Sequence, residues 1–145
     1  MKLISPEFDD GDDLPEKAGY MAENENPELV VKEVPENAAS LVLIMDDPDA
    51  LEPAGKIWVH WVMYDIDPSV NKIGSGESPG TEGITDFRET GYNGPNPPDG
   101  EHEYVFKLYA IDEMLGLEEG KNKEEIEEAM EGHVIEKAEL KGLYE

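Results

Sequence analysis

Apolar residues along the chain gather in short stretches, separated by longer segments rich in Asp, Glu, Gly and Pro. The clearest stretch is 41–45, a continuous apolar run that ends before Asp46 and Pro48. Such a run is typical of a strand buried on both faces. Other stretches carry the β-branched and aromatic side chains that strands favour. The predicted strands cover residues 2–4, 29–34, 41–45, 57–66 and 104–111.

The later part of the chain has a helical pattern instead. Residues 123–131 place Ile126 and Met130 on one helical face, with acidic residues on the opposite face. Asn122 is a predicted N-cap, and Glu125 three residues later completes a capping box. No helical pattern lies between the predicted strands, so a parallel β–α–β fold is not expected. The sequence therefore predicts an all-β fold, an antiparallel β-sandwich with one short C-terminal helix.

The composition narrows the setting of this fold. The chain has 145 residues, no cysteine and a formal net charge of −25. This length suits a single domain over residues 1–145, and the missing cysteines exclude disulfides and thiol nucleophiles. No apolar run has the roughly 18 residues of a membrane helix, and residues 1–10 lack a signal-peptide pattern. We therefore expect a cytoplasmic protein without membrane insertion. Its negative charge makes binding to nucleic acid unfavourable. The same acidity is compatible with a high-salt milieu.

Two histidines lie in the predicted strands or directly beside them. Because side chains alternate along a strand, His102 is expected to share a face with Tyr104, Phe106 and Leu108. By the same alternation, His60 is expected to lie with Trp58, Val62 and Tyr64. Taken singly, a histidine in such surroundings is explained as a core residue bonded to a backbone or carboxylate group.

Two further features follow strands. Asp47 and Asp49 flank Pro48, and aspartate in such a position commonly starts a turn by bonding its own backbone. Residues 94–98 read Gly-Pro-Asn-Pro-Pro, which indicates a stiff loop, because proline fixes φ and glycine permits unusual values.

Taken together, these features form four segments in a definite order. They are Asp-Pro-Asp-Ala at 47–50, Trp-Val-His-Trp at 58–61, Gly-Pro-Asn-Pro-Pro at 94–98 and Gly-Glu-His-Glu-Tyr at 100–104. With this order and spacing, the chain resembles the phosphatidylethanolamine-binding protein (PEBP) family, in particular its bacterial and archaeal Raf kinase inhibitor-like branch. The resemblance covers nearly the whole chain. It implies a Greek-key β-sandwich around a large antiparallel sheet, and a small, rigid anion pocket near one end.

The resemblance also implies the residues of this pocket. Matched position by position, they are Asp47, Asp49, Trp58, His60, Gly94, Pro95, His102 and Tyr104, with Trp58 in the wall. Imidazole, phenol and backbone N–H groups can donate to phosphate oxygens, while an aspartate can accept from the second nitrogen of a histidine. The chain departs from the family pattern at Leu51, Asn96 and Glu103. Glu103 replaces an arginine, which lowers the expected anion affinity, although alternation points it away from His102.

The implied function is that of a non-enzymatic protein without cofactor or metal. Its ligand would be a small anion such as phosphate, acetate or a phosphorylethanolamine-like group, and it would modulate a partner protein as kinase or protease inhibitors do. One alternative is a metal-dependent hydrolase that uses His60, His102 and an aspartate as zinc ligands. Another is a pure interaction module with no ligand. The sequence leaves the physiological ligand, the partner and the oligomeric state open, a homodimer included.

Overall fold

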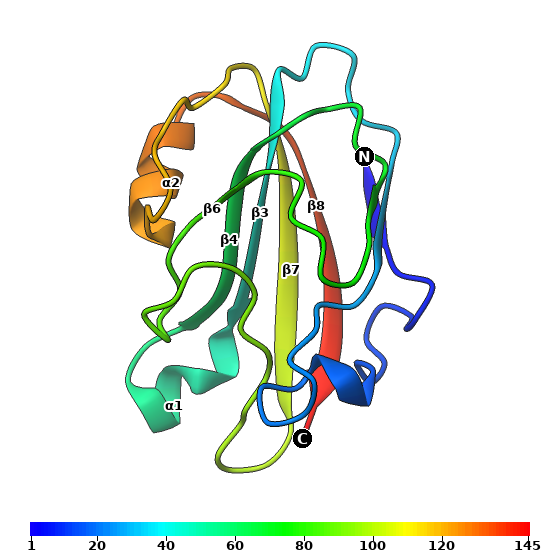
Figure 1. Ribbon diagram of the computed structural model, residues 1–145, viewed down its shortest axis with the longest axis vertical. Helices are drawn as coiled ribbons and strands as arrows, with labels where there is room; N and C mark the ends of the chain where they lie inside the picture. Colours follow the sequence, from blue (N-terminus) through cyan, green and yellow to red (C-terminus); the bar gives the residue numbers. More distant parts are fainter.

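Two antiparallel sheets form the computed structural model, which describes residues 1–145 (Figure 1). The small sheet has the order β1-β2-β5, and the large sheet has the order β6-β4-β3-β7-β8. The strands are β1 (Lys2–Ile4), β2 (Leu29–Lys32), β3 (Ser40–Asp47), β4 (Trp58–Ile66), β5 (Lys72–Ile73), β6 (Thr81–Glu82), β7 (His102–Ile111) and β8 (Val134–Tyr144). The helices are η1 (Glu16–Ala18), η2 (Pro48–Ala50), α1 (Leu51–Ala54) and α2 (Lys123–Met130).

The large sheet has Greek-key connectivity. Within this sheet, β3, β4 and β6 come in chain order and lie side by side, with β5 of the small sheet between β4 and β6 in the chain, and β7 then returns to pair with β3. Three consecutive strands followed by a fourth beside the first define this motif. The predicted all-β, Greek-key sandwich with a short C-terminal helix is confirmed.

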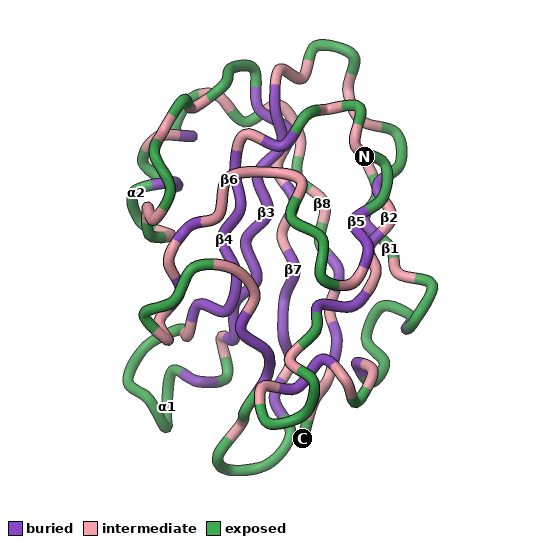
Figure 2. The backbone as a smooth tube through the Cα atoms, viewed as in Figure 1, coloured by how far each residue is buried: buried purple, intermediate pink, exposed green.

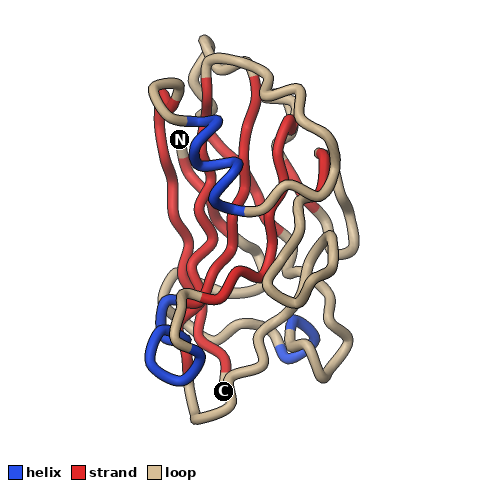
Figure 3. Tube along the Cα trace, turned by 90° about the vertical axis from the view of Figure 1, so that its left-hand side faces the viewer, coloured by secondary structure: helices blue, strands red, loops and turns tan.

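The large sheet is covered on both faces. On one face, Leu43, Met45 and Trp61 pack against Leu29 and Ile73 of the small sheet. The opposite face packs against α2, which Figure 3 shows lying across the strands. The central strands are accordingly the most deeply buried part of the backbone (Figure 2). The apolar run predicted as a strand buried on both faces is therefore the centre of the molecule.

Helix α2 begins where the capping box places it. The Asn122 side chain accepts a hydrogen bond from the Glu125 backbone at 2.9 Å, and the Glu125 carboxylate accepts one from the Asn122 backbone at 3.1 Å. Ile126 and Met130 are the buried residues of the helix. The predicted cap and apolar face are both confirmed.

The longest strand, β8, was not predicted from the sequence. Its residues pair with β7 along nearly the whole of both strands, from His102 opposite Tyr144 onward. Leu140 is the one apolar residue of β8 that is fully enclosed. Charged residues occupy many of the other positions, since β8 lies at the edge of the sheet. The strands β5 and β6 were likewise not predicted, and each spans two residues only.

A segment near the start of the chain lies along the outer edge of β8. The Gly11 backbone donates to the Lys141 carbonyl at 2.8 Å, and the Leu143 backbone donates to the Asp12 carbonyl at 2.9 Å. Asp13 and Leu143 form a parallel bridge. Residues 11–13 thus pair with β8 as a short additional strand would.

A β-bulge in β4 changes the direction of His60. Met45 pairs with Trp61, while the next residue of β3 pairs with Val59, so two steps on β4 match one step on β3. A bulge of this kind shifts the alternation of side chains beyond it. Val62 and Tyr64 pack under α2, away from His60. The prediction that His60 shares a face with Val62 and Tyr64 is therefore wrong, although Trp58 borders the same cavity as His60, as expected. Tyr104, Phe106 and Leu108 share a face of β7 as expected.

Candidate functional site

The ends of three neighbouring strands bring the predicted site residues together. In an antiparallel sheet, the end of a central strand lies beside the beginnings of its two neighbours. Here β3 ends at Asp47, which pairs with Trp58 at the start of β4. On the other side of β3, His102 opens β7. Figure 1 shows α1 and the turn before β7 at this same end of the molecule.

Asp47 organises the turn that follows β3. Its Oδ1 atom accepts a hydrogen bond from the Asp49 backbone at 2.9 Å, which caps η2, and Pro48 occupies the first position of that helix. Asp49 in turn accepts a bond from the Glu103 backbone at 2.8 Å, which ties the turn to β7. Asp47 thus forms the turn by accepting a bond from its own neighbouring backbone, as considered from the sequence. Asp49 accepts its hydrogen bond from a backbone N–H group and not from a histidine.

His102 lies between two carboxylates. Its Nδ1 atom is 2.6 Å from Asp47 Oδ2, and its Nε2 atom is 2.5 Å from Asp99 Oδ1. The imidazole is almost enclosed, with 5% of its side chain exposed, whereas the Asp99 side chain is 53% exposed. Burial alone would lower the pKa of His102, but the bonds to Asp47 and Asp99 outweigh it and raise the pKa. The charged form of the ring is therefore favoured.

His60 has a different environment. It packs edge-on against the rings of Phe87 and Tyr104, with centroids 5.2 and 5.1 Å away, and its Nδ1 atom is 2.7 Å from the Asn93 carbonyl. Burial lowers the pKa of His60, since an apolar site disfavours the charged ring. The site thus combines one imidazole whose charged form is favoured with another whose neutral form is favoured.

The Tyr104 ring lies between the two imidazoles. Its centroid is 5.1 Å from that of His60 and 6.4 Å from that of His102. Burial, together with the Asp47 carboxylate, raises the pKa of the phenol well above its usual value, so the hydroxyl keeps its proton. That hydroxyl is buried and forms no hydrogen bond of ordinary distance and angle within the protein, although the Asp47 carboxylate and the Asn96 backbone lie near it. Buried polar atoms without partners are uncommon, so the phenol is available as a donor to a bound group.

These side chains border a cavity of about 230 Å³. Among the predicted residues, Asp47, Trp58, His60, His102 and Tyr104 line it. Asp49, Gly94 and Pro95 do not. The remaining lining residues are Ala50, Pro53, Ala54, Phe87, Asn96, Pro97 and Pro98. Of these, the last three belong to the predicted stiff loop, whereas no pattern in the sequence pointed to Phe87.

Gly94 and Pro95 support the site from behind. The Gly94 backbone donates to Asn24 Oδ1 at 2.7 Å, and the Pro95 carbonyl accepts from the Tyr20 backbone at 2.8 Å. Both residues are buried against the segment that contains η1. A Cβ atom at Gly94 would lie 1.9 Å from the Ala18 carbonyl oxygen, so this close approach requires glycine.

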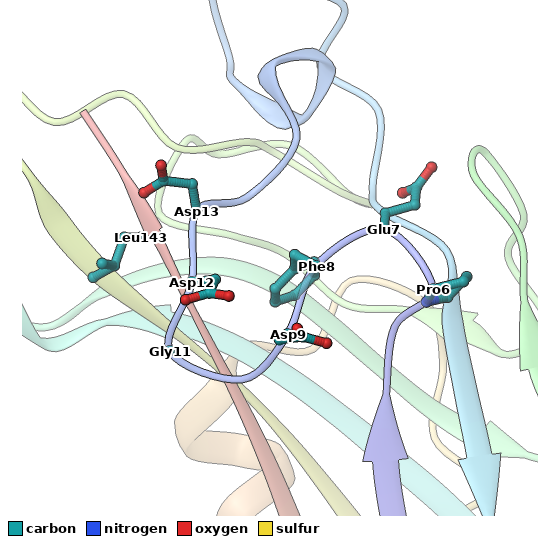
Figure 4. Close-up of a pocket in the computed structure, with 8 residues that line it drawn as sticks. All are labelled: Pro6, Glu7, Phe8, Asp9, Gly11, Asp12, Asp13 and Leu143. Atoms are coloured by element: carbon teal, nitrogen blue, oxygen red, sulfur yellow. The ribbon is translucent and has the colours of Figure 1, made fainter.

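A larger hollow of about 540 Å³ lies elsewhere, between the segment before η1 and the end of β8 (Figure 4). It is lined by Pro6, Glu7, Phe8, Asp9, Gly11, Asp12, Asp13 and Leu143. Four of these residues are acidic, and none is a histidine, lysine or arginine. Such a lining repels anions, so the smaller cavity is the better candidate for an anion site.

Neither a metal cluster nor a membrane-spanning helix is present. No three histidine, aspartate or glutamate side chains are arranged to hold a metal ion. None of the helices is long and apolar enough to cross a bilayer.

His60 should titrate at a lower pH than His102 and His133. We expect the pKa of His60 to lie below the ordinary value of 6.5 and that of His102 above it. The bond to Asp112 also raises the pKa of the exposed His133. His102 thus stabilises the fold at low pH, an effect lost as pH rises through its raised pKa, while His60 opposes folding as pH falls below 6.5.

Following the ring proton shifts against pH by NMR would check this order. Substituting His60, His102 and His133 one at a time by glutamine assigns the signals. Titration of His60 at or above the pH at which His102 titrates would contradict the described environments.

Comparison with known proteins gives a consistent result. The family model described as phosphatidylethanolamine-binding protein matches residues 4–145. A UPF0098 protein of Methanothermobacter thermautotrophicus is 43% identical, over 99% of this chain and 98% of its own length. A UPF0098 protein of Chlamydia trachomatis is 40% identical, over 100% of this chain and 99% of its own.

Solved structures agree with the sequence relatives. The crystal structure of CT736 from Chlamydia trachomatis, described as a homologue of the phosphatidylethanolamine-binding protein, superposes with a TM-score of 0.94. The two chains are 39% identical, and the match covers 99% of this chain and 96% of CT736. Escherichia coli YbcL, described as a member of the mammalian PEBP family, superposes with a TM-score of 0.90 at 25% identity, over 99% of this chain and 97% of its own.

Proposed function

The chain belongs to the phosphatidylethanolamine-binding protein family, and on this premise we propose that the cavity at the end of its large sheet binds a small anion. The ligand class is inorganic phosphate or a compact phosphorylated group such as phosphorylethanolamine. Binding, rather than catalysis, is the proposed activity. The modulation of a partner protein that the sequence implies stays a prediction.

The observation that carries this proposal is the buried Tyr104 hydroxyl without a partner. Tyr104 borders the same cavity as His102, whose charged form is favoured. A phenol O–H and an imidazolium N–H are both donors, and a hydrogen bond to a charged group is stronger than one between neutral groups. An anionic oxygen between them would satisfy the buried hydroxyl and meet a positive charge.

Asp47 supports binding without contacting the anion as a bare charge. Its two oxygens are engaged, one by the Asp49 backbone and the other by His102 Nδ1. The bond to Nδ1 fixes the ring orientation and favours its charged form. Asp47 is therefore a positioning residue for His102, as the sequence predicted for one of the two aspartates.

The size and the walls of the cavity limit the ligand. At about 230 Å³, the cavity is smaller than the ~300–1,000 Å³ of pockets that hold drug-sized molecules. Trp58 and Phe87 supply an aromatic wall against which a short carbon chain can pack. A phosphorylated head group fits these dimensions, whereas the acyl chains of an intact lipid would have to stay outside.

Titration with inorganic phosphate and with phosphorylethanolamine tests the proposal. At about pH 6.5, both ligands should shift the NMR ring signals of His60 and His102 and leave those of His133 in place. Tyr104→Phe removes one hydrogen bond and should weaken phosphate binding roughly three- to tenfold. Absence of a response at both His60 and His102 up to about 100 mM ligand, or an equal response at His133, would exclude the proposed site.

A further inference from the structure

The second carboxylate on His102 comes from a residue outside the predicted set. Asp99 lies in the turn between Pro98, which borders the cavity, and Gly100, whose φ of +120° only glycine adopts readily. From this turn, its Oδ1 atom reaches His102 Nε2 at 2.5 Å. Both nitrogens of the imidazole are therefore occupied by carboxylates of the protein itself.

The two carboxylates differ in how firmly they are held. Asp47 is buried, with 4% of its side chain exposed, and it also caps η2. Asp99 is 53% exposed, and the contact with His102 is its one side-chain hydrogen bond. Ion pairs that reach solvent are weak, because water competes for both partners. Asp99 can leave His102 by a side-chain rotation into water, while Asp47 cannot.

We propose that Asp99 is a built-in competitor of the ligand: its carboxylate occupies the donor of His102 that an anionic oxygen takes on binding. This inference rests on the proposed anion site. Nδ1 stays with the enclosed Asp47, so the proposed exchange takes place at Nε2, whose partner Asp99 is the more exposed of the two carboxylates. Binding then exchanges the Asp99 carboxylate for the ligand at Nε2. The affinity of the site reflects the difference between the free energies of these two contacts.

The exchange has a consequence for selectivity. A ligand with a single carboxylate group offers Nε2 the same chemistry that Asp99 already supplies. A phosphate offers further oxygens, one of which can accept from the Tyr104 hydroxyl that has no partner in the unliganded protein. Breaking the contact between Asp99 and His102 costs every ligand that takes Nε2 the same free energy, so the additional bond to Tyr104 is what favours phosphate over a small carboxylate such as acetate.

Removing the competitor tests this inference. Asp99→Ala should bind inorganic phosphate roughly three- to tenfold more tightly than the unchanged chain. Asp99→Asn, which keeps the shape but loses the charge, should fall between the two. Acetate, used as a second probe, should gain by a similar factor from Asp99→Ala and should bind more weakly than phosphate to both proteins. NMR titration at about pH 6 keeps His102 charged in every variant, because Asp47 stays bonded to it.

Glu101→Ala is the matched control. Glu101 is an exposed neighbour of His102, so its removal changes the net charge equally without freeing Nε2. We expect its effect on phosphate affinity to be less than about twofold.

The outcomes separate the two proposals. Binding by the unchanged chain with equal gains in Asp99→Ala and Glu101→Ala would overturn the competitor and leave the anion site standing. Weaker binding in Asp99→Ala would also overturn it, since Asp99 would then assist the ligand. Binding that appears only in Asp99→Ala would support the competitor but exclude anion binding by the unchanged chain, and no binding in any variant would exclude both.

Discussion

Gly94→Ala is expected to lower the free energy of unfolding by about 3 kcal/mol. The new Cβ atom would lie 1.9 Å from the Ala18 carbonyl oxygen and 2.9 Å from backbone atoms of Gly19 and Tyr20. Backbone atoms cannot rotate away as a side chain can, so either the loop or the segment around η1 has to move. Urea denaturation followed by tryptophan fluorescence would measure the loss.

The same substitution at Gly74 provides the control. A Cβ atom there would lie 2.3 Å from the Glu77 carboxylate, the flexible end of a side chain. We expect the loss at Gly74 to stay below about 1 kcal/mol. Equal losses at Gly74 and Gly94 would show that the close approach behind the cavity is not what demands glycine.

Asp46→Ala is expected to cost about 3 kcal/mol of stability through a different mechanism. Asp46 is fully buried on the face of β3 opposite to the cavity. Its Oδ2 atom accepts from Lys107 at 2.9 Å and from Lys123 at 2.8 Å. Truncation leaves two largely buried ammonium groups without a counter-ion, and removing one member of a buried pair is strongly destabilising.

Lys123→Met separates this effect from a loss of packing. It keeps most of the side-chain stem and leaves the pair of Asp46 with Lys107 intact, so we expect a loss of about 1 kcal/mol. Combining both changes should cost less than the sum of the single losses, because one charge no longer lacks its partner. Thermal denaturation of the four proteins would measure this coupling. A loss below 1 kcal/mol in Asp46→Ala would mean that water replaces the missing carboxylate.

Local patterns in the sequence were sufficient for the centre of the fold and for α2. The apolar run at 41–45 and the capping box at Asn122 each depend on neighbours a few residues away. β8 was missed for the opposite reason. Its exposed positions are charged and its pairing partner lies more than twenty residues earlier, so its place in the sheet depends on contacts that no local pattern records.

The residues of the candidate site were likewise predicted in part. Motif resemblance predicted Asp47, His60, His102 and Tyr104, all of which border the cavity. The face of His60 was predicted wrongly because a single extra residue in β4 alters the alternation, and the sequence carries no sign of that bulge. Asp99 looked like an ordinary turn residue. Its importance depends on the direction of one side chain across the turn, which only the three-dimensional structure gives.

The segment that pairs with the outer edge of β8 also affects how molecules meet one another. An uncovered edge strand offers unpaired N–H and C=O groups on which further chains can stack into fibres. Here the groups of Lys141 and Leu143 are already bonded to Asp10, Gly11, Asp12 and Leu14. The carboxylates of this segment add mutual repulsion to that steric cover. Residues 10–14 thereby protect this end of β8, beside the proposed site of ligand exchange, against edge-to-edge pairing with another chain.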